Sequence, residues 1–226
     1  RLTIGAYGLV SLHPDFVNLK NLEYLDLSSN CFEEIPEILT PENFPNLHAL
    51  VMNANQRHTI YDLSNDKREN IGGFIKDDLS TSKGMNSFKR ILKWSNLDTL
   101  RLSVNYLQGE LPDMKYEGLP EWTFEDLKDS LATGVTELPE KLVGLPKVLP
   151  DTKFFAINFN RFTGNLPDWL LYHPNLDQWI PYSLVFSQEG KCKDGKSAGF
   201  VNEPVSLDYY YEIYANKKYN PNKEQE

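Results

Sequence analysis

The sequence predicts an α/β fold in which successive copies of one short unit each add a strand to a single parallel sheet. Three observations predict it: a spacing of aliphatic residues that recurs along the chain, an asparagine that follows each copy at a fixed distance, and Leu-Pro pairs further on in several copies. Self-similarity of this kind is the sequence signature of a fold built from stacked units.

Four copies carry the pattern most clearly. The first runs from Leu22 to Phe32 and reads LxxLxLxxNxF. The other three keep this spacing at Leu47, Leu50, Met52 and Asn55, at Leu97, Leu100, Leu102 and Asn105, and at Thr152, Phe155, Ile157 and Asn160. Two degenerate units flank them, with Tyr7 and Leu184 where the asparagine would stand. Atypical end units are expected to cap an open core.

The spacing has a physical reason. Alternating aliphatic residues point from one side of a short strand into the core, and the residues between them face outward. The asparagine turns the chain, because its short amide can bond neighbouring backbone groups. In a stack these asparagines should form a ladder that bonds peptide groups otherwise buried and unpaired. The Leu-Pro segments are expected to return along the opposite side as turns or short helices.

Residues 97–112, which read LxxLxLxxNxLxGxLP, resemble the leucine-rich-repeat family. The resemblance implies an α/β solenoid of about six repeats with two insertions. Its parallel β-sheet would form the concave face, and irregular turns, 3-10 or short helices the convex face. The mixture of repeats and insertions is also similar to bacterial surface leucine-rich-repeat lipoproteins of gut Bacteroidetes, which implies an extracellular or cell-surface location. None of the 20 asparagines lies in an N-x-Ser/Thr acceptor, which favours a bacterial source.

The repeat pattern also predicts the organisation of the chain. We expect a leucine-rich-repeat solenoid over 1–195 and a C-terminal cap strand and tail over 196–226, because Leu207 to Tyr214 alternates like a strand. Two intervals between asparagines are about twice as long as the unit, and we expect insertions there at about 56–94 and 113–137.

Each insertion is predicted to contain a helix. In the first, Ser87 to Trp94 has the spacing of a short amphipathic helix. The second carries four apolar residues at helical spacing, Trp122, Phe124, Leu127 and Leu131. Long insertions on a rigid scaffold often bind ligands, but they also cover exposed core. The sequence leaves both roles open.

Composition excludes several function classes. A net charge of −9 disfavours nucleic acid, which is bound mainly through clustered Lys and Arg. No run of residues is apolar enough for a membrane span in this chain. The four histidines, His13, His48, His58 and His173, have no metal-ligand spacing, and no nucleophile, phosphate-binding or zinc-protease motif occurs. We therefore expect no catalytic residue, no metal and no cofactor.

Two cysteines, Cys31 and Cys192, test the stacking. If they lie about four units apart, strands at ~4.8 Å spacing separate their Cα atoms by roughly 20 Å. A disulfide needs less than about 7 Å, so we expect two free thiols.

The residues between the inward leucines form the face that we expect to bind. It mixes aromatic, polar and apolar side chains with little charge, a composition typical of an interaction surface. The candidate ligand-binding residues are Tyr24, Asp26, Val51, Asn53, Arg101, Ser103, Phe154, Asn158, Gln178 and Tyr182. Tyr24, Arg101, Phe154 and Tyr182 are the expected anchors, because large aromatics and Arg carry most binding energy at interfaces.

The sequence thus predicts a non-catalytic recognition module. Its partner would be a protein or a glycan, bound through the concave sheet face and the insertion loops. The alternative is a structural spacer or scaffold domain within a larger cell-surface protein. The identity of the ligand and the oligomeric state stay open at this point.

Overall fold

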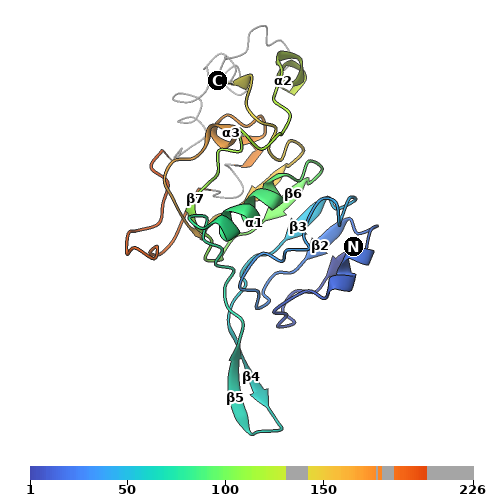
Figure 1. Cartoon of the computed structure of the whole chain (residues 1–226), viewed down its shortest axis with the longest axis vertical. Helices are drawn as coiled ribbons and strands as arrows, with labels where there is room; N and C mark the ends of the chain where they lie inside the picture. The colour runs from blue at the N-terminus through green and yellow to red at the C-terminus, as the bar shows by residue number, and fades with distance from the viewer. Residues whose placement is uncertain (131–141, 177, 180–185, 203–226) are drawn as a thin grey trace, which may run out of the picture.

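The computed structural model describes residues 1–130, 142–176, 178–179 and 186–202. Its centre is a five-stranded parallel sheet whose strands follow the order of the chain (Figure 1). The strands are β1 (Leu2–Thr3), β2 (Tyr24–Asp26), β3 (Ala49–Val51), β6 (Thr99–Arg101) and β8 (Phe154–Ala156). The prediction of an α/β repeat fold with a parallel sheet is therefore confirmed.

Strand pairing follows the repeat spacing read from the sequence. Leu25 pairs with Leu50, Leu50 with Leu100, and Leu100 with Phe155. All four side chains are at most 1% exposed, so one inward residue of each repeat stacks on the next inside the core. Removing an aliphatic side chain of this size from water contributes roughly 1.5–3 kcal/mol, which makes this row a main source of stability.

The predicted asparagine ladder is present. Asn30, Asn55, Asn105 and Asn160 are each at most 1% exposed. The Nδ2 group of Asn105 donates to the carbonyl of Met52 in the preceding repeat at 2.9 Å and to that of Leu102 in its own at 3.0 Å. Asn160 repeats this arrangement one unit further on. The amides of Asn30, Asn105 and Asn160 therefore each tie two neighbouring repeats together. The Asn55 amide donates only to the Met52 carbonyl of its own repeat, and its Oδ1 atom has no partner among the described residues.

A fifth ladder member escaped the sequence analysis. Gln188 accepts a hydrogen bond at Oε1 from the Phe162 amide at 3.3 Å and donates from Nε2 to the Ile157 carbonyl at 3.2 Å. These are the bonds that the next asparagine would make. The sequence placed Leu184 at this position, which lies outside the described residues. A glutamine is one methylene longer than asparagine, so it reaches the same groups from a differently spaced backbone.

The turn before each ladder asparagine is strained. The residues that immediately precede these asparagines are in the left-handed region: Ser29, Ala54, Val104 and Phe159, at φ 57°, 55°, 58° and 55°. Val104 is the β-branched residue among them, and the left-handed region costs such a residue roughly 1–2 kcal/mol. The ladder bonds and the Val104 amide, which donates to the Asn158 carbonyl at 3.0 Å, hold the turn in place.

The last degenerate unit differs from the prediction. Leu176, Gln178 and Trp179 are helical, so the strand expected there is not formed at these positions. The backbone amide of Asn175 donates a hydrogen bond to His173 Nδ1 at 3.0 Å and closes the turn before this helical segment. From this helical segment Trp179 still reaches the core, where its ring lies 4.9 Å from that of Phe155. Burial of the large indole decides the backbone conformation here.

The first long interval begins with a hairpin that the sequence did not predict. Strands β4 (His58–Asp62) and β5 (Lys67–Ile71) pair antiparallel and project away from the sheet (Figure 1). Both ends of the hairpin are held at one place, since the Gln56 amide donates to Asn30 and the Gly73 amide to Cys31. Gly72 has φ 60°, and a Cβ atom there would lie 2.1 Å from the Cys31 carbonyl oxygen.

After the hairpin the chain rejoins the repeat stack. Helix α1 (Ser82–Leu92) begins at Ser82 and not at the predicted Ser87, because the Thr81 hydroxyl caps it by accepting a bond from the Gly84 amide. Its apolar face buries Phe88, Ile91 and Leu92 against the core. Figure 1 shows α1 lying along the sheet, so this part of the interval forms the back layer of a repeat.

The remaining elements lie outside the five-stranded sheet. A parallel pair joins β7 (Gln108–Glu110) to β9 (Arg161–Thr163). Three short helical segments are also outside this sheet: the 3-10 helix η1 (Pro14–Asn18), α2 (Phe124–Ser130) and α3 (Asp168–Leu171).

Helix α2 agrees only in part with the helix predicted from Trp122. Trp122 precedes α2 and is 9% exposed, whereas Phe124 in its first turn is 41% exposed. Glu121 bridges to Pro146 and holds Trp122 in an extended segment. Leu131 and the cap strand expected over 207–214 lie outside the described residues.

We expect Asn105→Ala to lower the free energy of unfolding by about 2–4 kcal/mol, because it leaves buried carbonyls without a donor. Urea unfolding followed by circular dichroism measures the change. Asn165→Ala, at an exposed position outside the ladder, is the control and should be neutral. Equal stability of the two variants would mean that the ladder does not support the stack.

Relief of turn strain should act in the opposite direction. Asparagine tolerates the left-handed region, so Val104→Asn is expected to raise the free energy of unfolding by about 1 kcal/mol. Val104 is 45% exposed, and little packing is lost. The same urea titration tests this, and a destabilised variant would show that the Val104 side chain contributes more by packing than it costs by strain.

Candidate functional site

The outward residues of the sheet lie where the alternation predicts, but their exposure differs along the row. At the β2 end, Tyr24 is half-buried beneath Arg1, whose guanidinium carbon lies 4.3 Å from the ring centre. Asp26 accepts a hydrogen bond from the Ser28 amide at 2.9 Å. Val51 is only 8% exposed, so it offers little surface to a partner.

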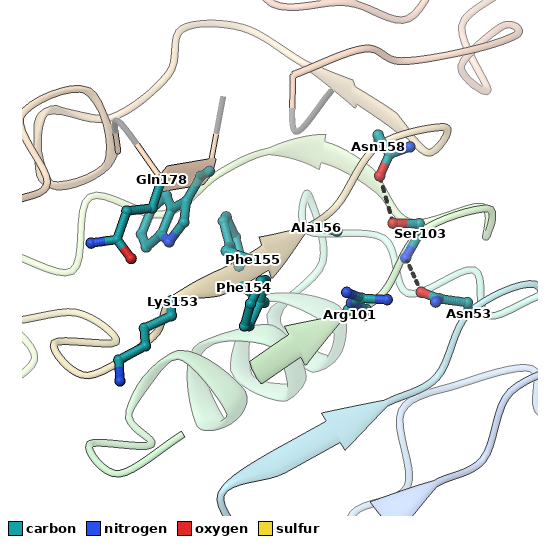
Figure 2. Close-up of a pocket in the computed structure, with 10 residues that line it drawn as sticks. Asn53, Arg101, Ser103, Lys153, Phe154, Phe155, Ala156, Asn158 and Gln178 are labelled. Atoms are coloured by element: carbon teal, nitrogen blue, oxygen red, sulfur yellow. Dashed lines mark hydrogen bonds between the residues drawn. The ribbon is translucent and has the colours of Figure 1, made fainter. Parts of the chain in front are cut away.

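The other end of the face is hollowed. Beside β6 and β8 lies a hollow of about 200 Å³ (Figure 2). Six of the candidate residues line it: Asn53, Arg101, Ser103, Phe154, Asn158 and Gln178. Tyr24, Asp26 and Val51 do not, and Tyr182 lies outside the described residues. The structure thus brings together the candidates of the later repeats and leaves those of β2 and β3 apart.

A row of polar side chains forms one wall. Ser103 Oγ donates to Asn158 Oδ1 at 2.6 Å, and the Ser103 amide donates to Asn53 Oδ1 at 2.9 Å (Figure 2). These bonds fix both amide planes across three successive repeats. Neither Asn53 Nδ2 nor Asn158 Nδ2 has a hydrogen-bond partner among the described residues, so both can donate to a ligand.

An aromatic ring and two cations form the other wall. Phe154 is 49% exposed, although its neighbour Phe155 is buried, because alternation turns successive side chains to opposite faces. The guanidinium carbon of Arg101 lies 6.0 Å from the centre of the Phe154 ring. Figure 2 shows the Phe154 ring between Arg101 and Lys153. This wall can hold an apolar or aromatic group and attract a negative charge beside it.

Four lining residues were not among the candidates: Lys153, Phe155, Ala156 and Trp179. Lys153 stands one position before the predicted outward residue Phe154, and its position at the start of β8 was the only available signal. Trp179 was assigned to the core, and the indole does pack there, but it also lines the hollow. No periodicity reveals that second role, because it arises from the helical backbone at this position.

The floor of the hollow rests on a buried histidine. The His173 ring lies 4.2 Å from that of Trp179, and its Nε2 lies 2.8 Å from the Val148 carbonyl oxygen. Burial lowers the pKa of His173 to about 4, although its bonds to the Val148 and Leu149 backbone act the other way. The ring is therefore neutral at pH 7 and packs like an aromatic side chain.

Asp77 is a second buried ionisable group, and it accepts a hydrogen bond from the backbone of an earlier repeat. Burial raises the pKa of its carboxyl, and the Ile35 amide that donates to Oδ2 at 2.9 Å acts in the opposite direction. In the part of the chain that the structure describes, no group of three or more His, Cys, Asp or Glu side chains is placed to hold a metal. Cys31 and Cys192 are free thiols.

Protonation of His173 should weaken the fold. Its folded pKa of about 4 lies below the ordinary 6.5, so its neutral form stabilises the protein fully above pH 6.5. That contribution should fall as the pH drops from 6.5 towards 4, by roughly 3 kcal/mol over the whole range. Urea unfolding between pH 7.5 and pH 4.5 of the protein and of His173→Gln tests this. A variant with the same pH dependence as the parent would assign the effect to other groups.

Comparison with known proteins gives one family match. Residues 21–47, which contain β2 and its asparagine, match the family model described as Leucine Rich Repeat. No curated protein and no solved structure matches the chain. No helix among the described residues is long and apolar enough to cross a membrane. Residues 21–47 therefore carry a leucine-rich repeat, and the paired strands and the asparagine ladder continue its pattern through the later repeats.

Proposed function

We propose that the chain is a solenoid of about six repeats that acts as a non-catalytic recognition module. Its partner is a protein, bound at the concave sheet face over β6 and β8. Leucine-rich-repeat domains are generally protein-interaction modules, which supports this class of function. The residues that the structure describes give no competing catalytic arrangement.

One observation carries the proposal. A half-exposed phenylalanine, Phe154, stands between Arg101 and Lys153 at the rim of a hollow whose opposite wall donates hydrogen bonds. Exposed aromatic side chains and arginines of this kind supply most of the binding energy at protein interfaces. Phe155 fills the core position of β8, so the Phe154 ring is not required for packing of the core.

The chemistry of the hollow indicates the partner segment. Its two cations contrast with the net charge of −9 of the whole chain, so they form a local positive region. An apolar or aromatic side chain next to Asp or Glu would fit both walls. A glycan remains the second partner class, because the Asn53 and Asn158 amides could also bond sugar hydroxyl groups.

We also propose that the module works outside the cell or on its surface, as part of a bacterial lipoprotein. The resemblance to surface leucine-rich-repeat proteins supports this location, and the lack of N-x-Ser/Thr acceptors supports a bacterial source. Protease treatment of intact cells of the source organism that produce the protein tests it. Full protection of the repeat from external protease would count against it.

The binding experiment uses the whole chain as bait for chemical crosslinking to proteins of the source organism, followed by affinity measurement with the captured partner. Phe154→Ala should weaken binding about 30-fold or more, as expected for a central anchor. Tyr24→Ala should weaken it less, because Tyr24 lies outside the hollow. Val10→Ala, an exposed apolar residue not on the sheet face, is the matched control.

Three outcomes would change the proposal. Unchanged affinity in both Phe154→Ala and Tyr24→Ala would move the site to the β4–β5 hairpin or the second insertion. Binding on a glycan array that depends on Phe154, without a protein partner, would assign the hollow to sugars. Capture of neither class would favour a structural spacer.

A further inference from the structure

A second hollow lies on the other side of the asparagine ladder. It has a volume of about 350 Å³ and shares no lining residue with the hollow on the sheet face. Tyr106 and Arg161 form part of its wall, and each follows directly after a ladder asparagine. The repeat geometry therefore places the two side chains next to each other on adjacent units.

Arg161 is held by a stack of aromatic rings. The Phe74 and Tyr106 rings lie 3.9 Å apart between centroids at an interplanar angle of 14°. The guanidinium carbon of Arg161 lies 3.6 Å from the centre of the Tyr106 ring. This stack leaves the edge of the guanidinium plane, where its N–H groups point, available for other bonds. Because the group is already ordered, a ligand that binds there loses little side-chain entropy of the protein.

The guanidinium group has no carboxylate or hydrogen-bond partner among the described residues. Arg161 is half-buried, and an arginine at such a position is normally paired. The backbone amide of Arg161 is satisfied by the Leu107 carbonyl, so only the side-chain donors are open. These donors form a planar fork that matches two oxygen atoms of an anion.

Three lysines complete a positive lining around this fork, Lys76, Lys191 and Lys193. Lys76 and Lys193 pair with Glu33 at 2.6 Å and Asp78 at 3.4 Å. Both pairs are largely exposed on the lysine side, so each is weak and leaves the ammonium able to turn to an anion. Lys191 has no carboxylate partner among the described residues, and no acidic side chain lines the hollow.

The loop that carries two of these lysines is fixed in place. Lys191 and Ser197 form an antiparallel bridge, and the Cys192 amide donates to the Lys196 carbonyl at 2.9 Å. The Cys192 thiol donates to the Arg161 carbonyl at 3.4 Å and so ties the loop to β9. The cations are therefore positioned by backbone contacts and not by a bound partner.

We propose that this hollow binds a sulfate or phosphate group carried as an ester on a ligand. A tetrahedral oxyanion can accept two bonds from the Arg161 fork and further bonds from Lys191 and Lys193. A cluster of four cations in a chain with a net charge of −9 suits a group that carries one or two negative charges. The site is independent of the proposed protein-binding face.

Isothermal titration of the whole chain at constant ionic strength tests the proposal. The probes are sodium sulfate, sodium phosphate, glucose 6-sulfate and glucose 6-phosphate, each taken to millimolar concentration. Arg161→Gln should weaken binding about tenfold or more, because it removes two charge-assisted hydrogen bonds. Arg68→Gln, a matched loss of an exposed arginine that lines neither hollow, should bind like the parent.

A thermal melt of each variant separates loss of binding from loss of folding. If Arg161→Gln is unstable, Arg161→Lys keeps the charge and removes the fork, and it should still bind more weakly than the parent. Tighter binding of glucose 6-sulfate than of sulfate, or of glucose 6-phosphate than of phosphate, supports the proposal. The ester that gains affinity shows whether the ligand carries sulfate or phosphate. Equal affinity in Arg161→Gln and the parent, no binding of any probe, or no gain from the esters would overturn the proposal.

Discussion

The structure depends on one constraint, that peptide groups buried at the ends of the strands must find hydrogen-bond partners inside the protein. Each strand of the five-stranded sheet is only two or three residues long, so the chain turns inside the stack, where water is excluded. A buried amide left unpaired costs about as much as several exposed hydrogen bonds contribute. The asparagine side chain meets this need because it carries a donor and an acceptor on a very short stem.

The ladder also divides the surface into two regions. The side chains two positions before an asparagine face outward from the sheet, and Ser103 and Asn158 at these positions line the first hollow. Residues after each asparagine lie beyond the turn, and Tyr106 and Arg161 stand there. One set of buried amides therefore fixes the side chains of both hollows. Because they share no lining residue, each can change without altering the chemistry of the other.

The inward leucines and the asparagines were predictable because they repeat, and repetition needs no knowledge of tertiary contacts. Strands β2, β3, β6 and β8, the candidate residues Arg101 and Phe154, and most of the ladder follow from spacing alone. Gln188 was missed because its function depends on reaching the same carbonyl from another backbone position. The helix at Trp179 was missed because burial of one large ring overrides the local pattern. The hairpin has no repeat counterpart, so no comparison within the chain could reveal it.

The way in which the β4–β5 hairpin joins the stack has a consequence for variation. The backbone amides at its two ends donate to the carbonyls of consecutive residues, Asn30 and Cys31. The chain therefore leaves the repeat stack and returns to it at one place. No residue of the hairpin belongs to the apolar core cluster of the described residues. A hairpin of different length or sequence could therefore stand at this point of the chain while the repeats on either side keep their register.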